Sequence, residues 1–165
     1  MERLVAEFLA FVRGDALEDT ESVSPAALLR RVVDNAQRAG QNVALGPLEA
    51  PESARMRPQA IARALENLVA NAVRHGSRTV VSLAAGPAFV TFTVEDDGPG
   101  IAPERRAEAL EPFKRLDAAR DPNRGGGVGL GLSIAADIAL SHGGALRLGE
   151  SAGLGGLRAD LSIAL

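Results

Sequence analysis

The stretch that most constrains the fold lies near the middle of the chain, at residues 63–76, and reads RALENLVANAVRHG. Apolar residues in and just before it recur at helical spacing, which predicts a helix with one face in a core. These residues are Ile61, Ala64, Leu65, Leu68 and Ala72. A polar row lies about a quarter of a turn away. It consists of Asn67, Asn71, Arg74 and His75. Such a helix suits the wall of a polar cavity, although the polar row alone would also suit an exposed edge.

Size and composition restrict the classes of protein to consider. A chain of 165 residues suits one domain with a real core, and a net charge of −3 gives no support for nucleic-acid binding. Cysteine is absent, which excludes disulfides and thiolate metal sites. No apolar run approaches the ~20 residues of a membrane span, and the first residues lack the layout of a signal peptide. We therefore expect a cytoplasmic protein whose chain makes no membrane contact.

The pattern of apolar residues predicts an α/β protein. Three principal helices are expected at residues 25–40, 58–76 and 129–142, with shorter helices at 2–13 and 104–110. Strands are expected at residues 21–23, 42–45, 54–56, 78–83, 88–95, 145–148 and 157–165. Of these, the strands 42–45 and 54–56 are expected to form a hairpin. Helices packed on one face of a mixed sheet of five or more strands give a two-layer α/β sandwich.

Four segments rich in polar residues or glycine stand out together. In chain order they are Asn67 to Asn71, the DDGPG run at 96–100, the EPFKR run at 111–115 and the GGGVGLGL run at 125–132. Each has an ordinary interpretation as a turn, a loop or a core residue. The long, poorly periodic stretch between the last two has a length that is usually functional or disordered. The order and spacing of all four make coincidence a poor explanation.

The four segments offer complementary chemistry. Glycines before a helix let backbone N–H groups approach a phosphate, and the helix N-terminus adds a favourable partial charge. An Asp at the end of a strand can accept hydrogen bonds from an exocyclic amine, and the glycines after it let a flat base approach the backbone. An Asn oxygen suits Mg²⁺, and Arg74 can neutralise phosphate charge. A phosphate, a base and a metal ion therefore each find suitable residues.

At these four segments the chain resembles the catalytic and ATP-binding domain of sensor histidine kinases, whose superfamily includes gyrase B, a heat-shock chaperone and the MutL ATPases. NLVANAVRHG resembles the N box of that domain, EDDGPGIAPE the first glycine box, EPFKRLD the F box and GGGVGLGLSI the second glycine box. The similarity covers roughly residues 20–165 and is greatest to the osmosensing-type kinases. It implies the two-layer fold, ATP and Mg²⁺ as ligands, and residues 112–128 as an ATP lid.

The resemblance also implies roles for individual residues. Asn71 would coordinate Mg²⁺ on the ATP phosphates, and Asn67 and Arg74 would complete the catalytic set by supporting or contacting the phosphates. Asp96, the first residue of the DDGPG run, would accept a hydrogen bond from the adenine amine. The further nucleotide contacts would be His75, Gly98, Gly100, Ile101, Phe113, Arg115, Gly127, Val128, Gly129, Leu130, Gly131 and Leu132.

The residue at position 67 favours transfer of phosphate over hydrolysis. Hydrolytic relatives carry a Glu one turn before the metal-binding Asn, where it can activate water as a general base. Here that residue is Asn67, which takes up no proton at neutral pH. Glu66 is adjacent, but residues one apart do not share a face of a helix. Transfer to an external nucleophile is therefore the expected reaction.

The sequence contains two histidines, and neither lies in the setting of a phosphoacceptor. His75 lies inside the N box, where the family usually has a Tyr near the nucleotide. His142 is expected at the end of a helix, where a positive charge would be favourable. Residues 1–14 resemble the tail of the second helix of a dimerisation and phosphotransfer domain. We therefore expect residues 15–165 to be the catalytic and ATP-binding domain, with the phosphoacceptor histidine on a domain absent from this chain.

The resemblance implies three partners for the parent protein. They are its own dimerisation and histidine-phosphotransfer domain, a second copy in a homodimer, and a cognate response regulator. Any anchor in the inner membrane would lie outside this sequence. Two alternatives have the same fold: an anti-sigma-factor-type serine kinase, with a smaller lid and no comparable F box, and a non-catalytic ATP-binding module. The F box at 111–115 and the intact glycine boxes favour the histidine kinase.

Overall fold

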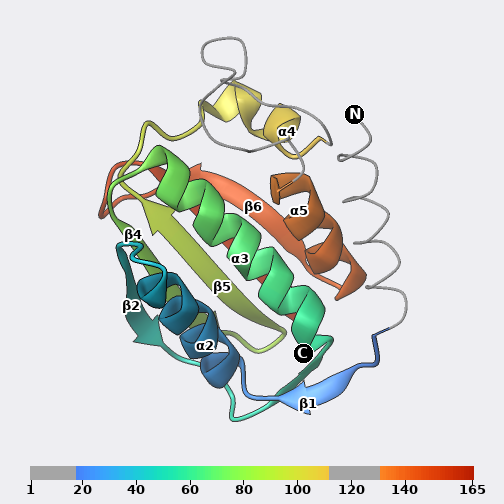
Figure 1. Cartoon of the computed structure of the whole chain (residues 1–165). Helices are drawn as coiled ribbons and strands as arrows, with labels where there is room; N and C mark the ends of the chain where they lie inside the picture. Colours follow the sequence, from blue (N-terminus) through green and yellow to red (C-terminus); the bar gives the residue numbers. More distant parts are fainter. Residues whose placement is uncertain (1–17, 112–130) are drawn as a thin grey trace, which may run out of the picture.

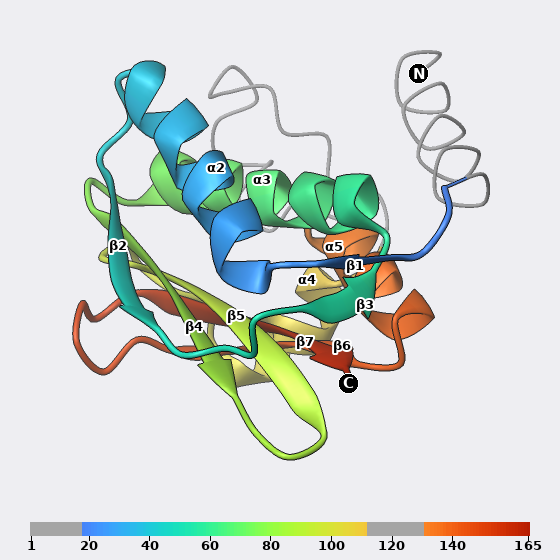
Figure 2. The ribbon, with the colours of Figure 1, turned by 90° about the horizontal axis from the view of Figure 1, so that it is seen from below.

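The structure of the chain is a computed structural model that describes residues 18–111 and 131–165. It has two layers, a five-stranded sheet and a layer of helices on one of its faces (Figure 1). The view at right angles in Figure 2 shows α2 (Pro25–Arg38) and α3 (Pro58–His75) on the same side of the sheet. The predicted two-layer α/β sandwich is confirmed.

The strand order of the sheet is β2-β4-β5-β7-β6. Its members are β2 (Val43–Leu48), β4 (Thr79–Ala85), β5 (Phe89–Asp96), β7 (Leu157–Ala164) and β6 (Ala145–Glu150). β2 and β4 run parallel, while every other neighbouring pair is antiparallel. Because α3 lies between β2 and β4 in the sequence, it supplies the crossover that a parallel pair requires. This connection places α3 across the middle of the sheet, as Figure 1 shows.

The predicted hairpin of residues 42–45 and 54–56 is wrong. Both segments are strands, but β2 pairs with β4, whereas β3 (Ala54–Met56) pairs with β1 (Glu21–Val23) in a separate two-stranded sheet. A strand of three residues forms few ladder bonds, so packing of the whole chain decides its partner. The true partners of both strands lie far away in the sequence, and the local pattern carries no sign of them.

Local sequence explains where two of the helices begin. α2 starts after Ser24, whose Oγ accepts a hydrogen bond from the backbone N–H of Ala27 at 3.1 Å, and Pro25 occupies its first turn. α3 also starts with a proline, Pro58. The other helices are η1 (Pro103–Arg105), α4 (Arg106–Ala109) and α5 (Gly131–Ser141). The predicted starts of α2 and α3 are confirmed, whereas residues 129–130 lie outside the described part of the chain.

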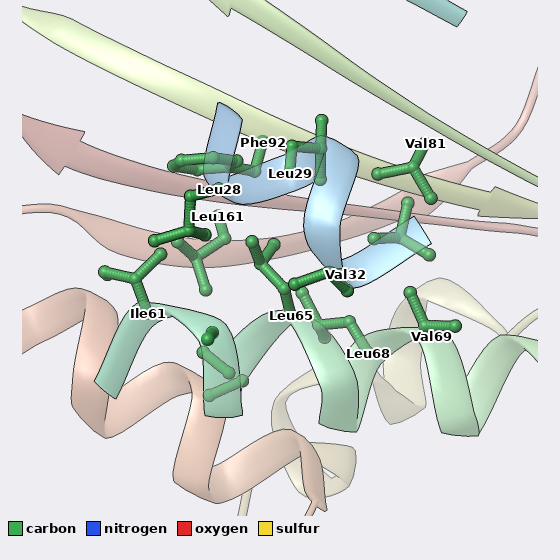
Figure 3. Packing of buried hydrophobic residues seen from close by; sticks show 14 of the residues in the cluster. Leu28, Leu29, Val32, Ile61, Leu65, Leu68, Val69, Val81, Phe92 and Leu161 are labelled. Atoms are coloured by element: carbon green, nitrogen blue, oxygen red, sulfur yellow. The ribbon is translucent and has the colours of Figure 1, made fainter. Parts of the chain in front are cut away.

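The core lies between the helices and the sheet (Figure 3). The apolar row predicted on α3 is buried at all five positions, with no more than 2% of any of these residues exposed. Figure 3 shows α3 side chains such as Leu65 directed toward the strands that carry Phe92 and Leu161. Because this face of α3 is fixed in the core, the direction of the polar row a quarter of a turn away is fixed as well.

Several predicted features lie outside the described residues. They are the helix at 2–13, the domain boundary after residue 14 and the lid at 112–128. The same is true of six predicted nucleotide contacts, namely Phe113, Arg115, Gly127, Val128, Gly129 and Leu130. All of these stay predictions. Within the two described ranges, none of the helices combines the length and the apolar character needed to cross a membrane.

Candidate functional site

The polar row of α3 lies beside the start of α5. Asn67, Asn71 and His75 are half-buried, whereas Arg74 is exposed. A Cβ built on Gly131, the first residue of α5, would lie 3.9 Å from the Cβ of Asn67. The predicted N box and the end of the predicted second glycine box are therefore neighbours in space. An amide side chain and the N-terminal end of a helix both suit a phosphate group.

The C-terminal end of α3 packs directly against the DDGPG segment. A Cβ built on Gly98 would lie 2.6 Å from the carbonyl oxygen of His75, closer than real Cβ contacts come. A Cβ built on Gly76 would lie 2.7 Å from Oδ1 of Asp97. The sequence offers space for a base as the reason for Gly98, and the structure adds a second reason, close packing against α3. The predicted N box and first glycine box form one unit.

Asp96 is the last residue of β5 and is 2% exposed. Its Oδ1 accepts hydrogen bonds from the backbone N–H groups of Gly98 at 2.9 Å and Leu157 at 3.1 Å. Among the described residues, no donor bonds to its Oδ2. A carboxylate that is fixed at one oxygen and open at the other can accept a hydrogen bond from a ligand. This geometry suits the role of Asp96 as an adenine contact, which stays a prediction.

The turn between β6 and β7 supports Asp96 from a second direction. The backbone N–H of Gly156 donates to the carbonyl oxygen of Asp96 at 3.0 Å, and a Cβ on Gly156 would overlap Asp96. Ser151 is 1% exposed, and its Oγ donates to Oε1 of Glu95 at 2.9 Å. The sequence interpretation assigns no role to this turn. The signal that could have drawn attention to it is the glycine-rich run GLGG at 153–156, which lies between two predicted strands.

Asp97 binds the loop that follows α3. Its Oδ1 accepts hydrogen bonds from the backbone N–H groups of Ser77 at 2.7 Å and Arg78 at 3.0 Å, and its Oδ2 accepts one from Oγ of Ser77 at 2.9 Å. These bonds lower the pKa of the Asp97 carboxyl, and the bond from the Arg78 N–H has the largest effect. The two adjacent aspartates therefore differ. Asp96 is buried, and its Oδ2 receives no hydrogen bond from the residues that the structure describes, whereas Asp97 is exposed and both of its oxygens accept hydrogen bonds.

The loop after Asp97 turns sharply at Gly100. The φ of Gly100 is +71°, a left-handed conformation that glycine adopts without strain. Ile101 follows and is half-buried, and its carbonyl oxygen accepts a hydrogen bond from Nε of Arg106 at 3.0 Å. Two more of the predicted nucleotide contacts, Gly100 and Ile101, therefore lie in the loop that leads from Asp96 toward η1.

His142 connects the end of α5 to the start of α3. Its Nε2 accepts a hydrogen bond from the backbone N–H of Arg57 at 3.1 Å, and its Nδ1 lies 2.7 Å from the carbonyl oxygen of Ile138. A carbonyl oxygen only accepts, so Nδ1 carries the proton and the ring is neutral in this arrangement. The sequence predicts a benefit from a charged His142, whereas the structure uses the neutral ring as a bridge to a residue 85 positions away.

The donor set around Asn71 suits a metal ion that is held mainly by a ligand. Among the described residues, no group of three His, Cys, Asp or Glu side chains could hold a metal ion alone. Asn71 offers one neutral oxygen, and Asn67 lies one turn away on the same helix. Mg²⁺ commonly takes one or two protein ligands and completes its shell with phosphate oxygens and water. These residues therefore fit Mg²⁺ only together with a bound nucleotide.

Comparison with known sequence families gives a match over most of the chain. The family described as "Histidine kinase-, DNA gyrase B-, and HSP90-like ATPase" matches residues 56–163. This range begins just before α3 and ends in β7, so it contains the polar row, Asp96 and α5. The matched range thus includes every described residue that the sequence predicts to lie in the site.

Comparison with individual proteins leads to sensor kinases. The sensor protein RstB of Escherichia coli (strain K12) is 38% identical over 168 residues, which cover 98% of this chain but only 38% of RstB. The ATP binding domain of PrrB from Mycobacterium tuberculosis has a TM-score of 0.70 at 29% identity, over 89% of this chain and 98% of that one. The histidine kinase domain of the E. coli osmosensor EnvZ has a TM-score of 0.64 at 38% identity, over 88% of each chain.

Proposed function

Because the chain belongs to the histidine kinase-, DNA gyrase B-, and HSP90-like ATPase family, we propose that it binds ATP with Mg²⁺ and donates the γ-phosphoryl group to a histidine on another domain. Its fold and its relatives are those of the ATP-binding catalytic domain of sensor histidine kinases. The acceptor would be a dimerisation and phosphotransfer domain of the parent protein, and a response regulator would receive the group next. This exchange would take place in the cytoplasm, where ATP is available.

The observation that supports this proposal is the meeting of three segments around the C-terminal half of α3. Asn67 lies beside Gly131 at the start of α5, and His75 lies against Gly98 of the DDGPG segment. The chain thus gathers an amide-bearing helix face, a helix N-terminus and a buried carboxylate, Asp96. A metal ion suits the amide-bearing face, phosphates suit the helix N-terminus, and an amine-bearing base suits the buried carboxylate.

Each residue has a distinct task in the proposed complex. The open Oδ2 of Asp96 would accept a hydrogen bond from the adenine amine, while the two backbone N–H groups on Oδ1 hold the carboxylate in place. The oxygen of Asn71 would hold Mg²⁺, which neutralises charge on the phosphate oxygens when bound. Asn67 and the first turn of α5 would face the phosphates. Arg74 is exposed and would approach them only from the rim of the site.

Transfer in this site depends on position and charge, since the described residues supply no general base on the polar row. The bond from the γ-phosphorus to the bridging oxygen breaks as a bond to the imidazole nitrogen forms, and ADP leaves. Asn67 cannot take a proton from water, which disfavours hydrolysis as the competing reaction. The chain's contribution is to hold ATP so that its γ-phosphorus faces the incoming histidine.

Titration calorimetry with Mg²⁺ and ATP tests nucleotide binding. Asn71→Asp and Asp96→Asn should each weaken binding by more than about tenfold, because each alters a charge next to the ligand. The matched controls are Asn35→Asp and Asp137→Asn, which change exposed residues on α2 and α5 in the same chemical sense. Unchanged affinity in both site variants would refute the assignment of the site.

Phosphotransfer is tested separately with labelled ATP and a separately produced dimerisation and phosphotransfer domain. We expect an acid-labile phosphohistidine on that domain, at a level that Asn71→Asp abolishes. Phosphorylation of a serine on a small antagonist protein instead would favour the serine kinase. Binding of ATP without any transfer, in every pairing, would favour the non-catalytic module.

A further inference from the structure

Thr79 carries a buried hydroxyl that is not hydrogen-bonded to any other described residue. It is the first residue of β4 and is 1% exposed. Its backbone N–H donates to the carbonyl oxygen of Asn42 at 3.1 Å, so its main-chain donor is satisfied. Among the described residues, its Oγ1 has no hydrogen-bond partner. A buried polar atom without a partner is unusual in folded proteins and calls for a ligand or a bound water.

The register of the sheet places this hydroxyl beside Asp96. Thr79 pairs directly with Asp96 across the antiparallel β4–β5 ladder. The neighbouring pair is hydrogen-bonded, because the N–H of Asp97 donates to the carbonyl oxygen of Arg78 at 3.3 Å. Hydrogen-bonded and non-hydrogen-bonded pairs alternate along such a ladder, so Thr79 and Asp96 form a non-hydrogen-bonded pair. In such a pair the Cα atoms are about 4.5 Å apart and the side chains approach closely.

Both side chains also lie on the face of the sheet that the helices cover. Along β4 the buried positions are Thr79, Val81 and Leu83, and along β5 the residues in line with Asp96 are Val94 and Phe92. Alternate residues of a strand share a face. The hydroxyl and the carboxylate therefore lie next to each other at the end of the two strands, at the level where α3 meets the DDGPG segment.

The two groups have complementary chemistry. An ionised carboxylate only accepts hydrogen bonds, whereas a hydroxyl can donate one. The adenine edge presents an amine donor next to a ring nitrogen acceptor. We propose that Thr79 helps to determine base specificity: its hydroxyl donates to that ring nitrogen, directly or through one bound water, while Asp96 accepts from the amine. This inference rests on the proposed function of the site.

Substitution of Thr79 separates this role from a structural one. Thr79→Val keeps the shape of the side chain and removes the hydroxyl, so the free protein should be as stable as the unaltered chain or more stable. The affinity for ADP with Mg²⁺ should nevertheless fall about tenfold, the loss typical of one hydrogen bond. Thr79→Ser keeps the hydroxyl and should retain the affinity. The control Thr91→Val removes a hydroxyl that bonds to Ser162 and should leave the affinity unchanged.

A nucleotide analogue identifies the atom involved. The diphosphate of 1-deazaadenosine lacks the ring nitrogen beside the amine, so the unaltered chain and Thr79→Val should bind it equally. Unchanged ADP affinity in Thr79→Val, with weak binding by Asp96→Asn, would overturn the role of Thr79 and leave the proposed function standing. Unchanged affinity in both variants would overturn the proposed function itself. A tenfold loss for the deaza analogue as well as for ADP would show that Thr79 acts on another atom, and would also overturn the inference.

Discussion

The C-terminal end of α3 contacts residues of the candidate site. Its N-terminal end is hydrogen-bonded by Glu18, which precedes β1, and by His142, which follows α5. The C-terminal end meets the DDGPG segment, where Gly98 lies against the carbonyl of His75. Asp97 then fixes the following loop through Ser77 and Arg78. Both of these contacts are made by the DDGPG segment, which the sequence predicts to bind the nucleotide.

The N-terminal end of α3 has a different kind of cap. Arg57 is in the N-cap position but makes no side-chain cap bond. Glu18 supplies the cap instead, since its Oε2 accepts from the N–H of Gln59 at 2.7 Å and its Oε1 from the N–H of Ala60 at 2.9 Å. A carboxylate is well suited to this position, because a helix N-terminus carries a partial positive charge. His142 accepts the N–H of Arg57 as described above.

This difference separates binding from stability along a single helix. Changes at the C-terminal end alter the position of groups that would contact the nucleotide, so they should reduce affinity as well as stability. Changes at the N-terminal end remove hydrogen bonds from the frame of the domain. They should reduce stability while the folded protein keeps its affinity, because α3 is also fixed along its length by the core.

Gly98→Ala should have the largest effect. The new Cβ would lie 2.6 Å from the carbonyl oxygen of His75, and a backbone oxygen within a helix cannot move aside cheaply. We expect a loss of about 3 kcal/mol of unfolding free energy, the upper range for overpacking, and a loss of ATP affinity of more than about tenfold. Urea denaturation and titration calorimetry measure the two effects. Gly153→Ala is the control, since a Cβ there meets nothing within 4 Å.

His142→Ala should be the most destabilising change at the other end. It removes the acceptor of the Arg57 N–H, while the carbonyl of Ile138 keeps the hydrogen bond from Oγ of Ser141. An unsatisfied buried group costs about 1–3 kcal/mol. We expect a loss of about 2 kcal/mol, with unchanged ATP affinity below the unfolding temperature. Leu140→Ala, at a side chain that is 70% exposed, should change stability by less than about 0.5 kcal/mol. If the fully folded His142→Ala variant bound ATP more weakly, the N-terminal end of α3 would also serve binding, and the distinction between the two ends would be wrong.

The C-terminal end of α3 is also the better predicted one. Its apolar row and its glycine stop follow from local sequence, whereas the choice of Asp96 over Asp97 as the ligand-binding carboxylate is implied by the resemblance to the sensor kinases. The structure buries Asp96 and leaves Asp97 exposed, which agrees with that choice. Periodicity and glycine runs carry this information because each reports on a few neighbouring residues.

The N-terminal end could not be predicted in the same way. The cap from Glu18 acts across 41 and 42 residues, and the bond to His142 acts across 85. Any carboxylate or neutral imidazole can accept from a backbone N–H, so neither residue type marks its partner. The parallel pairing of β2 with β4 was missed for the same reason, since the pairing depends on where α3 places two distant strands.

Glu18→Ala should have a smaller effect than His142→Ala. Glu18 is half-buried, so water can replace part of the cap, and loss of a helix cap costs about 1 kcal/mol. Glu18→Gln keeps an acceptor but removes the charge, so it should lose less than the alanine variant. Asp19→Ala is the neighbouring control, because Asp19 is exposed. Urea denaturation measures all three, and equal stability of Glu18→Ala and Asp19→Ala would contradict the cap.

Asp97→Asn should have the smallest effect on stability near neutral pH. It is recognised by how the stability difference from the unaltered chain changes with pH. The N–H of Arg78 and the donors of Ser77 lower the pKa of this carboxyl in the folded protein. The ionised form is therefore favoured by folding, and its stabilisation is complete above the unfolded Asp pKa of about 3.9. It is lost as the pH falls through the lower folded pKa.

The thermal midpoint of unfolding from pH 7 to pH 2 measures this dependence. The difference between the unaltered chain and Asp97→Asn should be constant above about pH 5 and should shrink toward zero in stronger acid. Asp137→Asn, at an exposed site on α5, should show no such convergence. Because Asp97 fixes the loop next to Gly98, the affinity of the variant for ATP should also fall by a factor of about three, which is less than the loss of a full hydrogen bond causes. A variant with altered acid stability and full affinity would show that the loop after α3 supports the fold but not the nucleotide site.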